Sequence, residues 1–84
     1  MSYKVTWQRS AEKAAARLPN TIRERVLERC AELADDPRPR QSRKLKGSDV
    51  YRLRVGTYRV LYAIFEDDLE VQVLRVAHRR EVYR

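Results

Sequence analysis

Cysteine, glycine and proline are scarce in this chain of 84 residues, which contains one, two and three of them respectively. The single Cys30 excludes an intramolecular disulfide and fits a reducing compartment. No apolar run approaches the roughly 20 residues of a membrane span, and the N-terminus has no apolar signal segment. One histidine and one cysteine cannot form a zinc site, and no glycine-rich phosphate loop is present. We therefore expect a cytoplasmic protein without metal, cofactor or membrane contact.

The length predicts a single domain, residues 1–84, with one modest core and a surface site. A hydrophobic content of 43% indicates an ordered chain. The net charge is +7, divided as +1 in residues 1–37 (seven Lys/Arg, six Asp/Glu) and +6 in residues 38–84 (twelve and six). This excess favours an acidic or phosphate-bearing partner over a basic surface that only keeps the protein soluble.

The first half of the chain predicts a strand followed by two helices. Residues 3–7 alternate in polarity, as a half-buried strand does. Ser10 is expected to cap an alanine-rich helix that ends at Pro19. Thr21 and Glu24 match a capping box at the start of the second helix. The apolar stripe of that helix comprises Ile22, Val26, Cys30 and Leu33, widened by Leu27 and Ala34.

The second half predicts a basic loop and three strands. The loop spans residues 37–47 and holds five basic residues and no acidic one. The strands are expected at residues 50–55, 57–65 and 69–77. In the last strand, Val71 and Val73 are expected on one face and Leu74 and Val76 on the other.

These elements predict an α+β fold of order β-α-α-β-β-β. The last three strands should form an antiparallel meander, and the helical hairpin should cover one face of the sheet. Trp7, Tyr58 and Tyr62 are expected to pack in the core. Cys30 lies in the middle of a buried stripe, which argues against a thiol nucleophile.

The uncovered face should carry a cluster of arginines. Arg52 and Arg54 alternate with apolar residues, so both project from one side of their strand. Gly56 supplies the left-handed conformation of a tight hairpin, and Arg59 follows on the returning strand. Three guanidiniums on adjacent strands repel one another, which favours an anion as their partner.

Several segments resemble the RelE branch of the RelE/ParE toxins of bacterial and archaeal toxin–antitoxin modules. The similar segments are Lys44-Leu-Lys-Gly47, Tyr51-Arg-Leu-Arg-Val-Gly-Thr-Tyr-Arg-Val-Leu-Tyr62 and Val76-Ala-His-Arg-Arg-Glu-Val-Tyr83. The resemblance covers essentially the whole chain. It implies a microbial-RNase-like fold and a metal-independent endoribonuclease, an mRNA interferase, that cleaves mRNA in the ribosomal A site and so inhibits translation. It also implies an antitoxin, encoded beside the toxin, that wraps around it.

The resemblance assigns the catalytic site residue by residue. Family positions that carry basic residues correspond to Arg52 and Arg54 on one strand, Arg59 on the next and Arg79 near the end, and a family tyrosine corresponds to Tyr83. Lysine occurs in the type member where this chain has Arg52 and Arg54. Because arginine stays protonated in proteins, neither residue can act as a general base.

Proton transfer must therefore come from a titratable group near the C-terminus. Histidine is the side chain that titrates near neutrality, so His78 joins Arg52, Arg54, Arg59, Arg79 and Tyr83 as a catalytic candidate. The roles of His78 and Tyr83 as base, acid or base-stacking group stay open. The flanking positive charge marks Arg43, Lys44, Lys46 and Arg80 as candidate RNA-binding residues.

Two other functions remain possible on these residues. One is a ParE-type toxin that inhibits DNA gyrase and cleaves no RNA. The other is a basic RNA- or ribosome-binding module without chemistry. The expected partners are the ribosome with its mRNA and an acidic, partly disordered antitoxin, which would bind the charged face of the second helix or an exposed sheet edge.

Overall fold

The computed structural model describes residues 2–83 and shows two helices against one face of a five-stranded sheet. The elements are β1 (Lys4–Trp7), α1 (Arg9–Ala16), α2 (Asn20–Glu32), β2 (Ser42–Lys44), β3 (Val50–Val55), β4 (Tyr58–Phe65) and β5 (Glu70–His78). The strand order is β1-β5-β4-β3-β2. The predicted α+β fold, helical hairpin and meander are confirmed.

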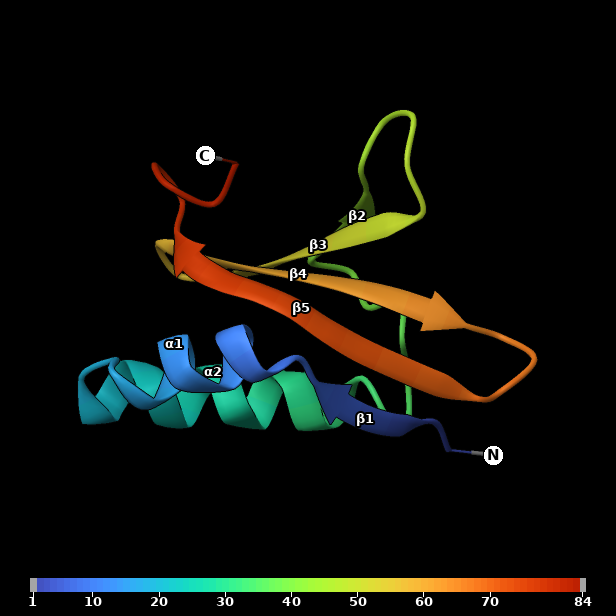
Figure 1. Cartoon of the computed structure of the whole chain (residues 1–84), viewed down its shortest axis with the longest axis horizontal. Helices are drawn as coiled ribbons and strands as arrows, with labels where there is room; N and C mark the ends of the chain where they lie inside the picture. Colours follow the sequence, from blue (N-terminus) through green and yellow to red (C-terminus); the bar gives the residue numbers. More distant parts are fainter. Residues whose placement is uncertain (1, 84) are drawn as a thin grey trace.

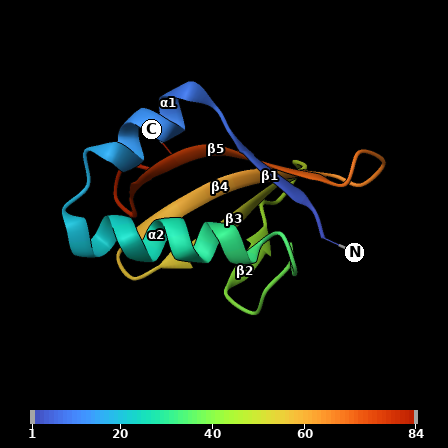
Figure 2. The same ribbon diagram turned by 90° about the horizontal axis from the view of Figure 1, so that it is seen from below.

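The two faces of the sheet are covered differently. β1 pairs in parallel with β5, and all other neighbouring strands are antiparallel. Figure 1 shows both helices on one side of the sheet and the C-terminal segment on the other. Figure 2, from the helix side, shows α2 crossing in front of the meander. None of the helices in residues 2–83 is long and apolar enough to cross a membrane.

The core lies between the helices and the sheet. Its fully buried side chains include Val26 and Cys30 from α2, Leu33 directly after it, and Leu53, Val60, Tyr62, Val71 and Val73 from the strands. The Tyr62 hydroxyl donates a 2.6 Å hydrogen bond to the carbonyl of Pro37, which satisfies its buried polar atom. Burial raises the pKa of the Cys30 thiol to about 12. Trp7 and Tyr58 are half-buried.

The basic loop of residues 37–47 contains a strand that the sequence did not indicate. Ser42–Lys44 form β2, whose residues pair with Leu53, Arg52 and Tyr51 of β3. A three-residue edge strand rich in charge gives no alternating apolar pattern, because one side of it faces water. β2 adds one strand at the edge of the sheet and brings Arg43 beside Arg52.

The helix starts also differ from the prediction. α1 begins at Arg9 after Gln8, so Ser10 lies inside the helix and does not cap it. α2 begins at Asn20 after Pro19, and no side chain caps either start. Pro19 has the extended backbone that precedes a helix, which moves the start ahead of Thr21. Leu27 is 45% exposed, so the buried stripe of α2 is narrower than expected.

A register shift in β5 changes which of its residues face the core. Leu61 lies opposite Arg75, but the next residue, Tyr62, lies opposite Val73, so Leu74 has no partner on β4. One extra residue on one strand reverses the alternation that follows it. Val73 and Val76 therefore both point to the core, where simple alternation had separated them.

Candidate functional site

The strand register gathers arginines on the sheet face away from the helices. Arg43 of β2 lies opposite Arg52 of β3, and Arg54 of β3 lies opposite Arg59 of β4. Directly opposed residues project from the same side of a sheet. These four residues, with Arg79, form the arginine face. The sheet thus places like charges in adjacent positions, an arrangement that destabilises the fold unless an anion compensates it.

Arg59 lies at the centre of the arginine face. Its Nη1 donates 2.8 Å hydrogen bonds to the carbonyls of Gly56 and Tyr58, which fix the guanidinium against the hairpin turn. Gly56 has a φ of 60°, the left-handed conformation that the tight turn requires. Burial, and then the charges of Arg52, Arg54 and Arg79, lower the pKa of Arg59. The arginine face is therefore strongly electropositive.

Arg52 is held in place without full hydrogen bonding. Its Nε is buried and has no hydrogen-bond partner among the described residues. Its Nη1 lies 3.4 Å from the Tyr83 hydroxyl, a long hydrogen bond. A buried donor without an acceptor is costly, and phosphate oxygens are strong acceptors for guanidinium donors. Because the Nε is buried, a ligand would meet Arg52 at its Nη donors, and the contact of Nη1 with Tyr83 is exposed.

The C-terminal turn, residues 79–83, folds back over this side of the sheet (Figure 1). The backbone N–H of Arg79 donates to the carbonyl of Thr57 at 2.8 Å, which ties the turn to the β3–β4 hairpin. Val82 is only 2% exposed, whereas Tyr83 beside it is 59% exposed. The turn therefore brings Arg79 and Tyr83 to the arginine face and leaves the phenol accessible.

His78 lies on the opposite face from the arginines. It is paired with Tyr58, and the two rings meet edge to face with centroids 5.5 Å apart. Its Nδ1 accepts a 3.3 Å hydrogen bond from the backbone N–H of Arg80. The strand alternation that places Arg59 on one side places Tyr58 and His78 on the other. The structure thus separates His78 from the other five catalytic candidates.

The four candidate RNA-binding residues fall in different places. Arg43 extends the arginine face at the β2 edge. Lys44 alternates to the helix side, where its Nζ lies 3.9 Å from Asp49. Lys46 is exposed in the β2–β3 turn and Arg80 in the C-terminal turn. Only Arg43 is continuous with the arginine cluster through the strand register.

Two residues beside the site were not singled out from the sequence. Arg75 lies opposite Leu61 on the arginine side, and its Nη2 donates a 3.1 Å hydrogen bond to the Glu81 carbonyl. Val82, within the C-terminal turn, is only 2% exposed. The alternation of β5 alone could not place Arg75, because the register shift precedes it. An apolar residue among polar neighbours after β5 is a weak signal that this segment packs against the sheet.

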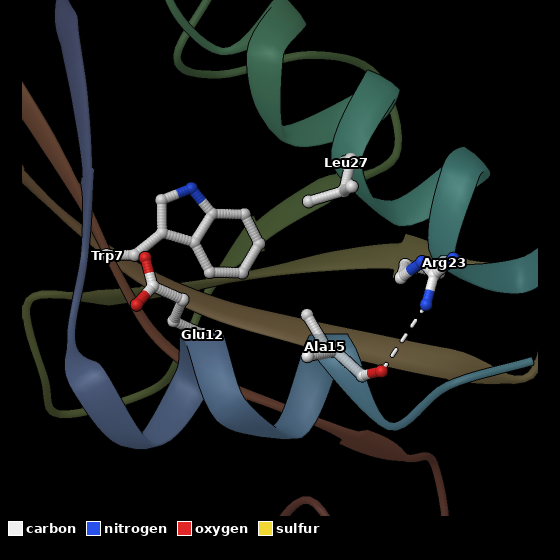
Figure 3. A pocket seen from close by; sticks show the side chains of 6 residues that line it. Trp7, Glu12, Ala15, Arg23 and Leu27 are labelled. Atoms are coloured by element: carbon white, nitrogen blue, oxygen red, sulfur yellow. Dashed lines mark hydrogen bonds between the residues drawn. The ribbon is translucent and has the colours of Figure 1, made fainter. Parts of the chain in front are cut away.

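A hollow lies on the helix side, between β1, α1 and α2. Trp7 and Leu27 face it from opposite walls, and Glu12 and Ala15 line its α1 side (Figure 3). Arg23 closes one end and donates a 3.4 Å hydrogen bond to the Ala16 carbonyl. The hollow has a volume of about 260 Å³ and is mostly apolar. It lies across the sheet from the arginines and has no cluster of cations for phosphate.

Metal-binding side chains do not gather in residues 2–83: no three or more His, Cys, Asp or Glu side chains lie where they could hold an ion together. The positive charge of the arginine face is supplied by guanidiniums. Five donors on each planar fork suit the oxygens of a phosphodiester. The arrangement can bind a phosphate group and stabilise additional negative charge on it.

Comparison with known proteins identifies the chain's relatives. Residues 5–83 match the family described as ParE toxin of type II toxin–antitoxin system, parDE. Toxin RelG of Mycobacterium tuberculosis is 35% identical over 89 residues, which cover 100% of this chain and 99% of that protein. The mRNA interferase toxin RelE of Escherichia coli is 32% identical over 88 residues, covering 99% and 92%.

A solved structure shows the same fold. The archaeal RelE–RelB complex from Pyrococcus horikoshii contains a chain that superposes with a TM-score of 0.85 and 33% sequence identity. The match covers 98% of this chain and 100% of the other. The helical hairpin and the sheet are therefore shared with that protein over almost all of this chain.

Proposed function

This chain belongs to the ParE toxin family of type II toxin–antitoxin systems, and we propose that it is a RelE-type toxin: a metal-independent endoribonuclease that cleaves mRNA in the ribosomal A site. The support from relatives is that curated proteins 32% and 35% identical over nearly the whole chain are RelE-type toxins, one of them an mRNA interferase. The observation that carries the proposal is the arginine face, in which the strand register places Arg43 opposite Arg52 and Arg54 opposite Arg59.

The proposed reaction is an attack by the 2′-oxygen of RNA on the adjacent phosphorus. The bond from phosphorus to the 5′-oxygen breaks and a 2′,3′-cyclic phosphate forms. The proton of the 2′-hydroxyl passes to solvent water, the Tyr83 phenol gives a proton to the 5′-oxygen, and the phenolate takes a proton back from water. The phosphorus passes through a pentacoordinate state with extra negative charge. Arg59 and Arg79 stabilise that charge, and Arg52 and Arg54 support them from the neighbouring strand. Because the guanidiniums are in place before the substrate arrives, little reorganisation is needed.

Tyr83 is the residue that we assign to proton transfer. Its hydroxyl is exposed and reaches Arg52 of the arginine face, and a phenol can donate a proton to the leaving 5′-oxygen. His78 is not assigned this role, because its ring packs against Tyr58 on the other side of the sheet. Arginine cannot accept the proton at neutral pH.

The ParE-type alternative makes a different prediction. The matched family takes its description from ParE, and a gyrase inhibitor would not need an exposed tyrosine beside an arginine cluster. The test incubates the purified chain with mRNA-programmed ribosomes and, separately, with gyrase in a supercoiling assay. Cleavage within the A-site codon together with normal supercoiling supports the proposal. Inhibited supercoiling with intact mRNA would replace it by the ParE-type function.

The same cleavage and supercoiling assays, together with a ribosome-binding measurement, can also identify a binding module without chemistry. Intact mRNA, normal supercoiling and salt-sensitive ribosome binding would favour such a module. Its binding would survive the Tyr83→Phe substitution unchanged, because a phosphate contact does not require the phenol hydroxyl. Ribosomes without mRNA and naked mRNA are the matched controls, and they show whether cleavage depends on the ribosome.

We propose an acidic antitoxin as the physiological partner of this cytoplasmic toxin. The P. horikoshii relative was solved as a RelE–RelB complex, and a chain of net charge +7 attracts an acidic segment. A short acidic reading frame beside the gene would identify the antitoxin. Co-purification that weakens on Arg52→Ala plus Arg54→Ala would place it on the arginine face. Unchanged affinity would place it elsewhere.

A further inference from the structure

The C-terminal turn carries two site residues but is attached to the sheet by residues that the chemistry does not use. We propose that Val82 and Arg75 are positioning residues, which hold the turn on the sheet so that Arg79 and Tyr83 stand beside Arg59. The inference rests on the proposed endoribonuclease function and assigns two further residues to the same site. Neither Val82 nor Arg75 needs to touch the RNA for this role.

Val82 acts as the anchor of the turn. It is 2% exposed, although it lies between two exposed residues, Glu81 and Tyr83. It lies apart from the cluster of side chains that forms the main core between helices and sheet. Its burial therefore does not serve the main core. It fixes the last residues of the chain against the sheet, and Tyr83 is the next residue along.

Arg75 acts as a clasp on the backbone of the turn. It projects from β5 on the arginine side, and its Nη2 donates to the Glu81 carbonyl at 3.1 Å. Because the acceptor belongs to the main chain, the contact fixes the path of the chain and not a particular side chain. It holds the residue that precedes Val82, so the clasp and the anchor act on adjacent positions.

The hydrogen bonds within the turn do not by themselves hold it on the sheet. The N–H groups of Glu81 and Val82 both donate to the His78 carbonyl, at 2.8 and 3.0 Å. These bonds close the turn on itself. Arg79 N–H binds Thr57 at the start of the turn, which leaves the end of the turn to Val82 and Arg75. Without them the phenol of Tyr83 would lose its position beside Arg52.

Misplacement of a catalytic group by about 1 Å can cost on the order of 100-fold in rate. We therefore expect Val82→Ala and Arg75→Gln each to lower kcat for mRNA cleavage by about 10- to 100-fold, with a smaller change in KM. Val71→Ala is the control for the first variant, since Val71 is fully buried in the main core. It should lower Tm but leave kcat of the folded protein unchanged.

Arg23→Gln is the control for Arg75→Gln. Arg23 also donates from its guanidinium to a backbone carbonyl, that of Ala16, but on the helix side. The two substitutions remove the same charge and the same kind of contact. Arg23→Gln should keep the wild-type kcat, and Arg75→Lys should recover part of the loss because an ammonium can still donate to the Glu81 carbonyl.

A double-mutant cycle separates positioning from direct RNA contact. In a background of Arg79→Ala plus Tyr83→Phe, the groups that Val82 and Arg75 position are already absent. Single-turnover rates in that background should therefore change less than about threefold when Val82→Ala or Arg75→Gln is added. A loss as large as in the wild-type background would show that the residues act on RNA directly or on the whole fold, and would overturn the proposal.

Hydrogen exchange gives a readout that does not depend on cleavage. Val82→Ala should speed exchange of the Glu81 and Val82 amides, or of a peptide covering them, while amides of β4 remain protected. If wild type cleaves no RNA but this exchange changes as expected, the endoribonuclease proposal fails while the anchoring of the turn stands. If exchange in the turn is unchanged in both Val82→Ala and Arg75→Gln, the positioning role is wrong whatever the activity.

Discussion

The two faces of the sheet differ in how their side chains are satisfied. On the helix side, apolar residues are buried together, and the Tyr62 hydroxyl has an acceptor in Pro37. On the other side, Arg54 lies opposite Arg59, and Arg52 buries an Nε without a partner. The helix side therefore has the burial and hydrogen bonding of a stable core. The arginine face instead has like charges in adjacent positions and an unsatisfied donor.

The difference indicates what each side is for. Like charges on neighbouring strands weaken a sheet, so their presence on one side requires a compensating ligand. Arginine keeps its charge at physiological pH, and its fork fits phosphate oxygens. The helix side therefore sets stability, and the arginine face sets activity. Substitutions on the two sides should separate these two properties.

Arg59→Ala is expected to have the largest effect. Removing one preorganised donor to a charged transition state costs about 100- to 1,000-fold in kcat, and Arg59 lies within reach of the charges of Arg52, Arg54 and Arg79. The measurement is single-turnover cleavage of mRNA on programmed ribosomes. Cleavage by Arg59→Ala at the wild-type rate would remove the central group from the proposed mechanism.

Tyr83→Phe should follow, with a loss of about 100-fold in kcat and little change in Tm. General acid–base groups typically contribute at least this much, and the exposed ring does not support the core. His78→Gln is the matched control at the other titratable candidate, and we expect less than a threefold effect. If His78→Gln lost activity while Tyr83→Phe kept it, the assignment of proton transfer would be reversed.

Tyr62→Phe should change stability but not chemistry. Deleting the hydroxyl leaves the buried Pro37 carbonyl without its donor, which lowers the free energy of unfolding by about 1–3 kcal/mol. For a domain of this size, each kcal/mol lowers Tm by roughly 4–8 °C. Thermal unfolding followed by circular dichroism measures the shift. A lower kcat in the folded variant would contradict the division between the two sides.

Glu66→Gln is expected to have the smallest effect and to appear only in acid. A hydrogen bond from Tyr3, then one from Arg38, lowers the pKa of Glu66. Below pH 4.5 the unfolded state binds this proton more readily than the folded state does. The stabilisation is therefore present above that pH and is lost as the pH falls further. Urea unfolding measured from pH 7 to pH 3 should show that the free energy of unfolding falls less steeply with acid in Glu66→Gln than in the wild type. Equal slopes of the free energy of unfolding against pH in the two proteins would show that Glu66 does not contribute to acid unfolding.

Much of the fold is predictable from the sequence because its apolar patterns are strong. The α2 stripe, the alternation of β3 and the Gly56 turn each determine local structure by themselves. β2 was missed because an edge strand of charged residues has no buried pattern. The predicted side of the sheet for Val76 was wrong because the register shift in β5 depends on its pairing with β4 and not on composition.

The site was less predictable than the fold. Arg52, Arg54 and Arg59 could be placed on one side from alternation alone, and the register confirms it. His78 was a candidate because histidine titrates near neutrality, and a reference pKa does not say on which side of the sheet a ring lies. Its pairing with Tyr58 places it on the helix side. The buried Val82 and the clasp by Arg75 are contacts between segments, which no local pattern encodes.

A paired measurement of cleavage and stability on Arg52→Met tests most directly whether the arginine face serves to bind an anion. The substitution keeps an apolar chain of similar length but removes the charge and the buried Nε that has no acceptor. If the arginine face is built for an anion, kcat should fall by about 100-fold while Tm stays equal or rises. A Tm that falls together with unchanged cleavage would contradict the account, because Arg52 would then serve the fold and not the reaction.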